Sequence, residues 1–249
     1  MYNEFVFGKD VFMKTEFPIA LDSNDNWSPP EAANQYFNKP MSILSDFWSG
    51  EEMANALLDK FPGKDTLLDL GTATGSVPLT MRMKTSMKAL GIEGLPVPEL
   101  GIEEYMLKDA SLYCWNKAPE LLATCDITKP FRIEDNEGKL IQFDYIISTD
   151  CFEHLVTERI PELVENIYNH LKDDGYGIFE INTGEFYEMH QTIKPEQWWL
   201  EQFRTKFNIN DELTKANFKY VRSNMIDGKL LYKNGHFDGW KILFWVTKK

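Results

Sequence analysis

The sequence has no continuous apolar run of about eighteen residues, the length that a helix needs to cross a bilayer. Its first ten residues, MYNEFVFGKD, lack the basic start and the apolar centre of a signal peptide. From these two absences we expect a cytoplasmic protein that does not bind membranes.

Cysteine is also scarce. The three cysteines are an odd number and none is spaced as CxxC: Cys114, Cys125 and Cys151. This pattern indicates neither a disulfide framework nor a zinc ribbon. We expect all three side chains to be reduced thiols.

Basic residues are outnumbered, with 26 Lys and Arg against 39 Asp and Glu, a formal net charge of -13 and a pI of about 4.8. The sequence has no dense Lys/Arg cluster. A protein of this charge repels polyanions. Stable binding to nucleic acid is therefore not expected.

The 249 residues are 43% hydrophobic, which suffices for one large core. Residues 1–62 are rich in proline and polar residues and predict a lead-in or lid segment, followed by one domain over 63–249. In that domain apolar runs alternate with helical stretches, at residues 66–70, 87–94, 121–127, 143–149 and 176–182. Five short strands separated by helices predict an α/β fold with a parallel sheet.

The last third of the chain has a different pattern. Pro195 precedes a stretch with apolar residues at helical spacing, EQWWLEQFRTKF. Apolar runs then follow at 218–224, 229–233 and 240–249, and Asn234-Gly235 is a tight-turn signal before the last of them. The parallel sheet is therefore expected to finish in antiparallel strands.

The stretch TLLDLGTATGS, residues 66–76, combines a predicted strand, a glycine loop and a helix start. A phosphate-binding P-loop needs a Lys-Ser/Thr pair after its last glycine, but Ser76-Val77 follow Gly75. A dinucleotide loop is disfavoured because Ala73 replaces its middle glycine and no third glycine follows. The loop instead suits a nucleoside-like ligand that lacks phosphates.

Four ordered motifs carry a family resemblance: LLDLGTATGS, GIEG, CDI and FDYIISTDCFEHL. Together they resemble class I S-adenosylmethionine-dependent methyltransferases over residues 65–182, with LKDDGYGIFEIN similar to the fifth-strand segment, in which a glycine turn precedes the strand. The resemblance implies a Rossmann-like, seven-stranded, mostly parallel sheet flanked by helices, with antiparallel C-terminal strands. It also implies a methyltransferase that uses S-adenosyl-L-methionine as its cofactor.

The resemblance assigns cofactor contacts to residues at the strand ends. The methionine end would lie against Asp69, Gly71, Thr72 and Gly75, the adenine against Asp126 and Ile127, and Thr149 would also contact the cofactor. The acid that binds the ribose is either Glu93 or Glu103, which are 24 and 34 residues after Asp69. We favour Glu93 because the shorter distance fits one helix and one strand.

The segment after the fourth predicted strand supplies candidate catalytic groups. Asp150, Glu153 and His154 would share one face of a helix if the helix began at Asp150. His154 is the leading general base, because imidazole titrates near neutral pH; a packing role for Glu153 and His154 is the alternative. A second alternative resembles the divalent-metal site of small-RNA 3′-end methyltransferases, with His190 as a further ligand. The acidic charge of the chain opposes that reading, so we expect no metal.

The acceptor side of the site is predicted from His190, Trp198 and Trp199, which follow the fifth predicted strand. Residues 94–120 and 183–217 are longer than the connections require and are candidate pocket insertions. We expect methyl transfer to an oxygen or nitrogen of a small-molecule or glycan-type acceptor. The rivals are an NAD-dependent dehydrogenase and a non-catalytic cofactor-binding protein. Neither the acceptor nor the oligomeric state has a signal in the sequence.

Overall fold

A computed structural model describes most of the predicted domain. The described residues are 62–72, 75, 77–78, 81, 87–94, 121–135, 137–183, 190–214 and 241–249, together with the backbone of the short strands β1 (Val11–Thr15), β9 (Met225–Ile226), β10 (Lys229–Leu231) and β11 (Phe237–Asp238). Several predictions fall outside them: Glu103, Cys114, most of the 1–62 and 94–120 segments, the strand predicted at 218–224 and the Asn234-Gly235 turn.

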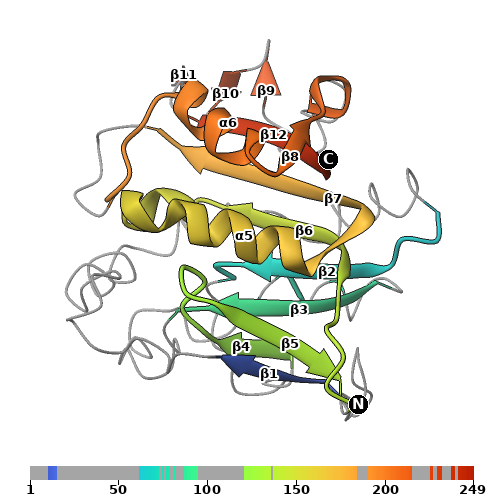
Figure 1. The fold of residues 1–249 in the computed structure, drawn as a ribbon. Helices are drawn as coiled ribbons and strands as arrows, with labels where there is room; N and C mark the ends of the chain where they lie inside the picture. The colour runs from blue at the N-terminus through green and yellow to red at the C-terminus, as the bar shows by residue number, and fades with distance from the viewer. Residues whose placement is uncertain are drawn as a thin grey trace, which may run out of the picture.

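Seven strands form the central sheet, in the order β4-β3-β2-β6-β7-β12-β8 (Figure 1). Their bounds are β2 Thr66–Leu70, β3 Lys88–Glu93, β4 Leu122–Thr124, β6 Phe143–Thr149, β7 Leu171–Asn182, β8 Phe207–Ile209 and β12 Lys241–Lys248. The first five strands in this order are mutually parallel, and β12 runs antiparallel to both of its neighbours. The predicted Rossmann-like, mostly parallel sheet with an antiparallel C-terminal strand is confirmed.

The strands form because both faces of the sheet are covered, which favours continuous apolar runs. Successive residues of one strand point to opposite faces. Accordingly Leu68 belongs to one apolar cluster with Ile146, whereas Leu67 belongs to a second cluster with Tyr145. The central strands therefore do not alternate between apolar and polar residues, because both of their faces are buried.

Two described helices cover one face of the sheet, as Figure 1 shows. Helix α5 (Ile160–His170) places Leu163 and Ile167 in the larger cluster, and α6 (Glu196–Arg204) places Phe203 there. Helix α6 begins directly after Pro195, as the sequence predicts. Pro195 itself is the extended residue before the helix, since a proline can precede or open a first turn without losing a hydrogen bond.

Two strand predictions need correction. Strand β5 (Phe131–Asp135) was not predicted; it pairs antiparallel with β1 outside the central sheet. Strand β7 begins at Leu171, before the expected glycine turn. In the β6–β7 pairing, Phe143 faces Leu171 and Tyr145 faces Tyr176, so the intervening residues of β7 form a bulge. The glycine feature is therefore an irregularity within the strand.

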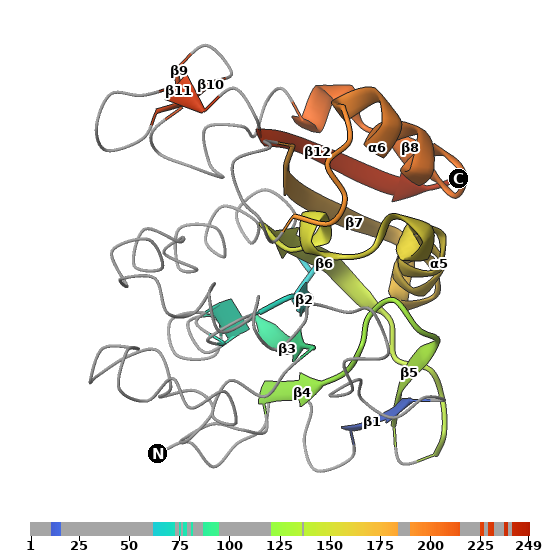
Figure 2. The ribbon, with the colours of Figure 1, turned by 90° about the vertical axis from the view of Figure 1, so that its left-hand side faces the viewer.

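The position of β2 defines where a ligand can bind. The chain runs from β2 to β3 and β4 on one side and then crosses to β6 and β7 on the other. In open parallel sheets, ligands bind beyond the carboxyl ends of the strands at such a reversal. The arrowheads of β2, β3 and β4 point to the left in Figure 1, so Figure 2 looks onto these ends.

No helix in the described part of the chain is long and apolar enough to span a membrane.

Candidate functional site

The glycine loop begins directly after β2. Gly71 and Gly75 have φ angles of 77° and 75°, in the left-handed region that favours glycine. The amides of Gly71 and Thr72 donate to the carbonyl oxygen of Ile92 at 2.8 and 3.0 Å, which holds the loop against β3. A Cβ at Gly71 would lie 2.2 Å from Sγ of Cys151. Both the backbone conformation and the available space therefore require glycine at position 71.

Asp69 is a buried carboxylate in β2, two residues before this turn. It is 4% exposed, and its Oδ2 accepts a 2.7 Å hydrogen bond from Oγ1 of Thr72. Burial raises the pKa of Asp69 to about 7; the Thr72 hydrogen bond opposes this shift, and the negative charge of Glu93 adds to it. A cationic ligand beside Asp69 would stabilise its ionised form.

Glu93 is the last residue of β3 and lies beside the glycine loop. The β2–β3 register pairs Leu70 with Ile92, so Glu93 is next to the strand end that delivers Gly71. Its Oε1 accepts a 2.9 Å hydrogen bond from the amide of Gly94. Glu93 thus ends β3 at the edge of the sheet from which the glycine loop leaves β2. Its rival Glu103 lies outside the described residues.

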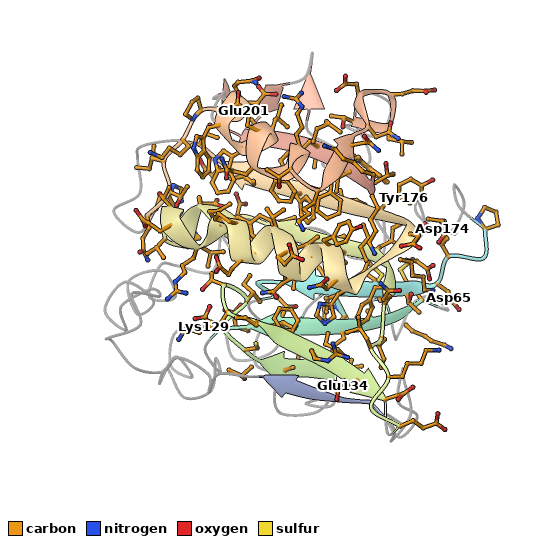
Figure 3. All side chains as sticks on the ribbon, in the orientation of Figure 1. Asp65, Lys129, Glu134, Asp174, Tyr176 and Glu201 are labelled. Atoms are coloured by element: carbon orange, nitrogen blue, oxygen red, sulfur yellow. The ribbon has the colours of Figure 1, made fainter. Side chains whose placement is uncertain are left out.

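Asp126 follows β4 and forms a turn. Its Oδ1 accepts hydrogen bonds from the amide and Oγ1 of Thr128, at 2.9 and 2.6 Å, and its Oδ2 lies 3.7 Å from Nζ of Lys129. The side chain of Asn166 in α5 donates to the carbonyls of Ile127 and Lys129, which fixes the turn to the helix. Figure 3 shows Lys129 at the same end of the sheet as the site and Asp65 at the opposite end. Ile127 is buried in the core.

The expected helical face after β6 is wrong. The strand ends at Thr149, Asp150 adopts a φ of 48°, and the first helical turn is the short 3-10 turn η5 (Phe152–His154). The amide of Asp150 donates to the carbonyl of Glu180 in β7. The chain therefore stays against β7 at Asp150, and the helical turn starts too late to include that residue.

Glu153, His154 and His190 come together in place of that helical face. One ligand atom from each of these side chains lies within 4.8 Å of the others. The two imidazole rings have centroids 4.8 Å apart and an interplanar angle of 81°. Glu153 and His190 are buried and His154 is half-buried. We call these three residues the histidine cluster; Asp150 is not part of it.

The tryptophan pair is divided between the core and its boundary. Trp199 is fully buried in the larger apolar cluster, whereas Trp198 is half-buried and packs against that cluster. Their ring centroids are 5.1 Å apart. This placement replaces the expected acceptor contact of Trp199 with a packing role, and leaves Trp198 and His190 as the predicted acceptor side.

Sequence reasoning missed three residues that shape the site. Cys151 packs under Gly71, the amide of Asn182 donates to Oε1 of Glu153 at 3.1 Å, and Thr192 binds the carbonyls of Glu153 and Leu155. Each acts through packing or a backbone hydrogen bond. No motif spacing signals such contacts, which appear only when the strand ends meet.

Comparison with known proteins identifies the family. The family described as "Methyltransferase domain" matches residues 47–223, more than half of the chain. No curated protein matches the sequence. Similar solved structures include a TehB-like S-adenosylmethionine-dependent methyltransferase from Corynebacterium glutamicum, at 16% identity and a TM-score of 0.54, covering 88% of this chain and 98% of that one.

Two further similar structures were solved with ligands. Phosphoethanolamine N-methyltransferase 2 of Haemonchus contortus, in complex with S-adenosyl-L-methionine, has 16% identity and a TM-score of 0.52, covering 93% of this chain and 61% of that one. The 1,6-didemethyltoxoflavin-N1-methyltransferase of Burkholderia thailandensis, with bound 1,6-didemethyltoxoflavin and S-adenosylhomocysteine, has 12% identity and a TM-score of 0.53, covering 95% of this chain and 94% of that one. At these identities the likeness is one of fold.

The residues at the strand ends fit this cofactor. S-adenosylmethionine is a nucleoside without phosphates and carries positive charge on its sulfonium and ammonium groups. The glycine turn offers backbone without a phosphate-binding lysine. Three carboxylates lie within two residues of the carboxyl ends of the neighbouring strands β2, β3 and β4, those of Asp69, Glu93 and Asp126. The chain belongs to the methyltransferase-domain family, and it is an S-adenosylmethionine-dependent methyltransferase.

Proposed function

We propose that this methyltransferase acts on an oxygen or nitrogen of a small-molecule or glycan-type acceptor, with His154 as the general base. One observation carries the proposal: His154 lies half-buried beside His190, three residues after the cysteine that packs under the glycine loop. The segment from Cys151 to His154 thus connects the contact with the glycine loop to the contact with His190, which supports this role.

The cofactor contacts in the proposal follow the strand ends. Asp69 and the loop formed by Gly71, Thr72 and Gly75 bind the methionine end, and Glu93 binds the ribose hydroxyls. Asp126 and Ile127 lie against the adenine, and Thr149 closes the site at the end of β6. The carboxylates favour a cationic cofactor by direct charge attraction.

The proposed reaction is an in-line displacement at the methyl carbon. His154 takes the proton of the acceptor O–H or N–H group while the lone pair of that oxygen or nitrogen forms the new bond to the methyl carbon. The electron pair of the broken carbon–sulfur bond stays on sulfur. Glu153, whose ligand atom lies within 4.8 Å of that of His154, adds negative charge beside the imidazolium that forms.

The acceptor side of the site is formed by His190 and Trp198. Lys194 lies 5.9 Å from the Trp198 ring centroid, and His190 is fixed by the backbone bonds of the residues that follow it. A small acceptor is supported by two structural neighbours whose names specify small substrates, a phosphoethanolamine N-methyltransferase and a 1,6-didemethyltoxoflavin-N1-methyltransferase. The net charge of -13 favours neutral or cationic acceptors over nucleic acid.

The test is a screen of small hydroxylated and amine compounds for transfer of a labelled methyl group, followed by His154→Gln on the best acceptor. We expect kcat to fall by about 10²–10⁴-fold, the usual contribution of a general base. The affinity for S-adenosylhomocysteine should stay unchanged. Glu158→Gln is the control, because Glu158 is an exposed residue of the neighbouring turn η6 (Thr157–Arg159).

Two outcomes contradict the proposal. Unchanged kcat in His154→Gln would remove the base assignment. Cofactor binding without methyl transfer to any small acceptor would favour the non-catalytic reading of the chain.

A further inference from the structure

We propose that Glu153, His154 and His190 form a binding site for a divalent transition-metal ion. Among the residues that the structure describes, this is the one group of three or more His, Cys, Asp or Glu side chains whose ligand atoms converge, all within 4.8 Å of one another. The sequence prediction of no metal rested on overall charge. The local chemistry of two imidazoles and a carboxylate favours a cation.

The backbone holds the two halves of this site together. The carbonyl of Glu153 accepts hydrogen bonds from the amides of Gln191 and Thr192, at 2.8 and 3.0 Å. The hydroxyl of Thr192 donates to the carbonyl of Leu155 at 2.6 Å and also lies 2.9 Å from the hydroxyl of Thr157. The residues that follow His190 are thus fastened to the turn that carries the other two ligands.

A backbone amide of β7 also orients the Glu153 side chain. Its Oε1 accepts a hydrogen bond from the amide of Asn182, the last residue of β7, at 3.1 Å. Metal-binding carboxylates are commonly oriented by such outer hydrogen bonds. Glu153 therefore has a fixed direction before any ion binds.

The three ligand atoms need to move only slightly to bind one ion. Zinc bonds to nitrogen and oxygen of about 2.0–2.2 Å put tetrahedral ligand atoms about 3.4 Å apart. The cluster is somewhat wider than this, at up to 4.8 Å. His154 is half-buried, whereas the other two side chains are buried. Rotation of His154 is the movement that would close the site.

The ligand set selects the class of metal. Two imidazoles and one carboxylate suit zinc, cobalt, manganese or ferrous iron, whereas calcium and magnesium prefer oxygen ligands alone. Three protein ligands also leave a coordination position open, as in catalytic zinc sites. The geometry therefore points to a site that can bind a further oxygen or nitrogen.

The role of the ion rests on the proposed function, which places the acceptor beside His154. An acceptor hydroxyl in the open position would have a lowered pKa and would release its proton to water. Its oxygen lone pair then forms the bond to the methyl carbon, the carbon–sulfur pair stays on sulfur, and the ion keeps its oxidation state. When the ion is bound, His154 is a ligand and does not act as the base.

The experiment measures metal binding directly and needs no acceptor. The full chain, stripped with a chelator and saturated with S-adenosylhomocysteine, is titrated with Co²⁺ and followed by calorimetry and by the visible absorption of the bound ion. We expect one site per chain, with the affinity at least ten-fold lower in His190→Gln and in Glu153→Gln. Glu158→Gln, an exposed carboxylate in the next turn, should bind like the wild type.

A loss of metal binding must be distinguished from misfolding of the variant. Glutamine keeps a carbonyl oxygen for the Asn182 amide, and S-adenosylhomocysteine affinity reports whether each variant is intact. No saturable Co²⁺ binding, or binding that neither variant weakens, overturns the metal site. A chelator-insensitive turnover that still depends on His154 overturns the metal's role and leaves the proposed base mechanism standing.

Discussion

Gly71 and Cys151 are in contact across the switch point of the sheet: a Cβ on Gly71 would lie 2.2 Å from Sγ and 2.6 Å from Cβ of Cys151. The glycine loop after β2 and the chain leaving β6 are therefore packed without a gap. This contact joins the proposed cofactor-binding loop to the segment that carries the proposed catalytic residues.

This contact predicts that Gly71→Ala weakens cofactor binding at least ten-fold and destabilises the fold. The φ of 77° alone costs an alanine about 1–2 kcal/mol, and the clash with Cys151 adds to that. Binding of S-adenosylhomocysteine and denaturant unfolding measure the two effects.

Gly63→Ala is the control for Gly71→Ala. Gly63 has a φ of 87°, but a Cβ there would meet nothing within 4 Å. It should show the backbone strain alone, with unchanged cofactor affinity. Equal effects of the two substitutions on binding would contradict the packing argument.

Asp69 predicts a pH dependence. Burial is the main cause that raises the pKa of Asp69 from its usual 3.8 to about 7. The stability that this raised pKa contributes is fully present below the pKa of the unfolded chain. It is lost as pH rises through about 7. The apo protein should therefore lose stability between about pH 4 and pH 7 by more than the Asp69→Asn variant does, as measured by urea unfolding across that range.

Cofactor binding should have the opposite trend with pH. The cationic cofactor prefers ionised Asp69, so the affinity for S-adenosylmethionine should rise as pH passes through about 7. Asp69→Asn should remove this rise, and Glu93→Gln should move it to lower pH because the Glu93 charge contributes to the raised pKa. A pH profile unaltered in Asp69→Asn would refute the assignment.

Asp144 is predicted to stabilise the base of β2. Its Oδ2 accepts hydrogen bonds from the amides of Asp65 and Thr66 and from the Thr66 hydroxyl, and its Oδ1 from Lys172. Burial alone would raise its pKa, but the Thr66 and Lys172 hydrogen bonds outweigh burial and lower it. This contribution is present above the unfolded pKa and is lost as pH falls through the lower folded pKa.

Asp144→Asn should reduce the free energy of unfolding by about 1–3 kcal/mol at pH 7. Its stability should also fall less than that of the wild type on acidification. Asp173→Asn is the control, because Asp173 is exposed and has one surface ion pair with Lys248. Chemical denaturation at neutral and acidic pH separates the two variants.

Substitutions of Trp198 and Trp199 should have different effects, one on acceptor binding and the other on stability. Trp199→Ala should lower the free energy of unfolding by about 3–5 kcal/mol, because its side chain is fully buried in the core. Trp198→Ala should destabilise less and should raise KM for the acceptor. A raised KM in an otherwise stable Trp199→Leu variant, with Trp198→Ala unaffected, would reverse the assignment.

The sequence predicted the fold through residues whose pattern is local. The strands at 66–70 and 143–149 match the structure because their apolar runs end at turn residues, and the glycine loop is recognisable from Gly71 and Gly75. Strand β5 escaped prediction because its pairing partner β1 is more than a hundred residues away in the chain. Long-range pairing of this kind leaves no local pattern.

The sequence singled out candidate site residues but not how they are arranged in space. His154 and His190 were identified singly by residue type, but their contact depends on the backbone bonds between Glu153 and residues 191–192. The helical face expected for Asp150 failed because the chain turns at Asp150 with a positive φ before one short 3-10 turn. Conformation at a strand end depends on neighbouring strands, which spacing alone does not report.

The most direct test of this account is a calorimetric titration with S-adenosylhomocysteine, with NAD as a parallel ligand and Glu93→Ala as the variant. We predict saturable binding of S-adenosylhomocysteine by the wild type, at least ten-fold weaker binding by Glu93→Ala and no binding of NAD. Equal affinity in Glu93→Ala would move the ribose contact elsewhere. Binding of NAD without S-adenosylhomocysteine would contradict the central claim.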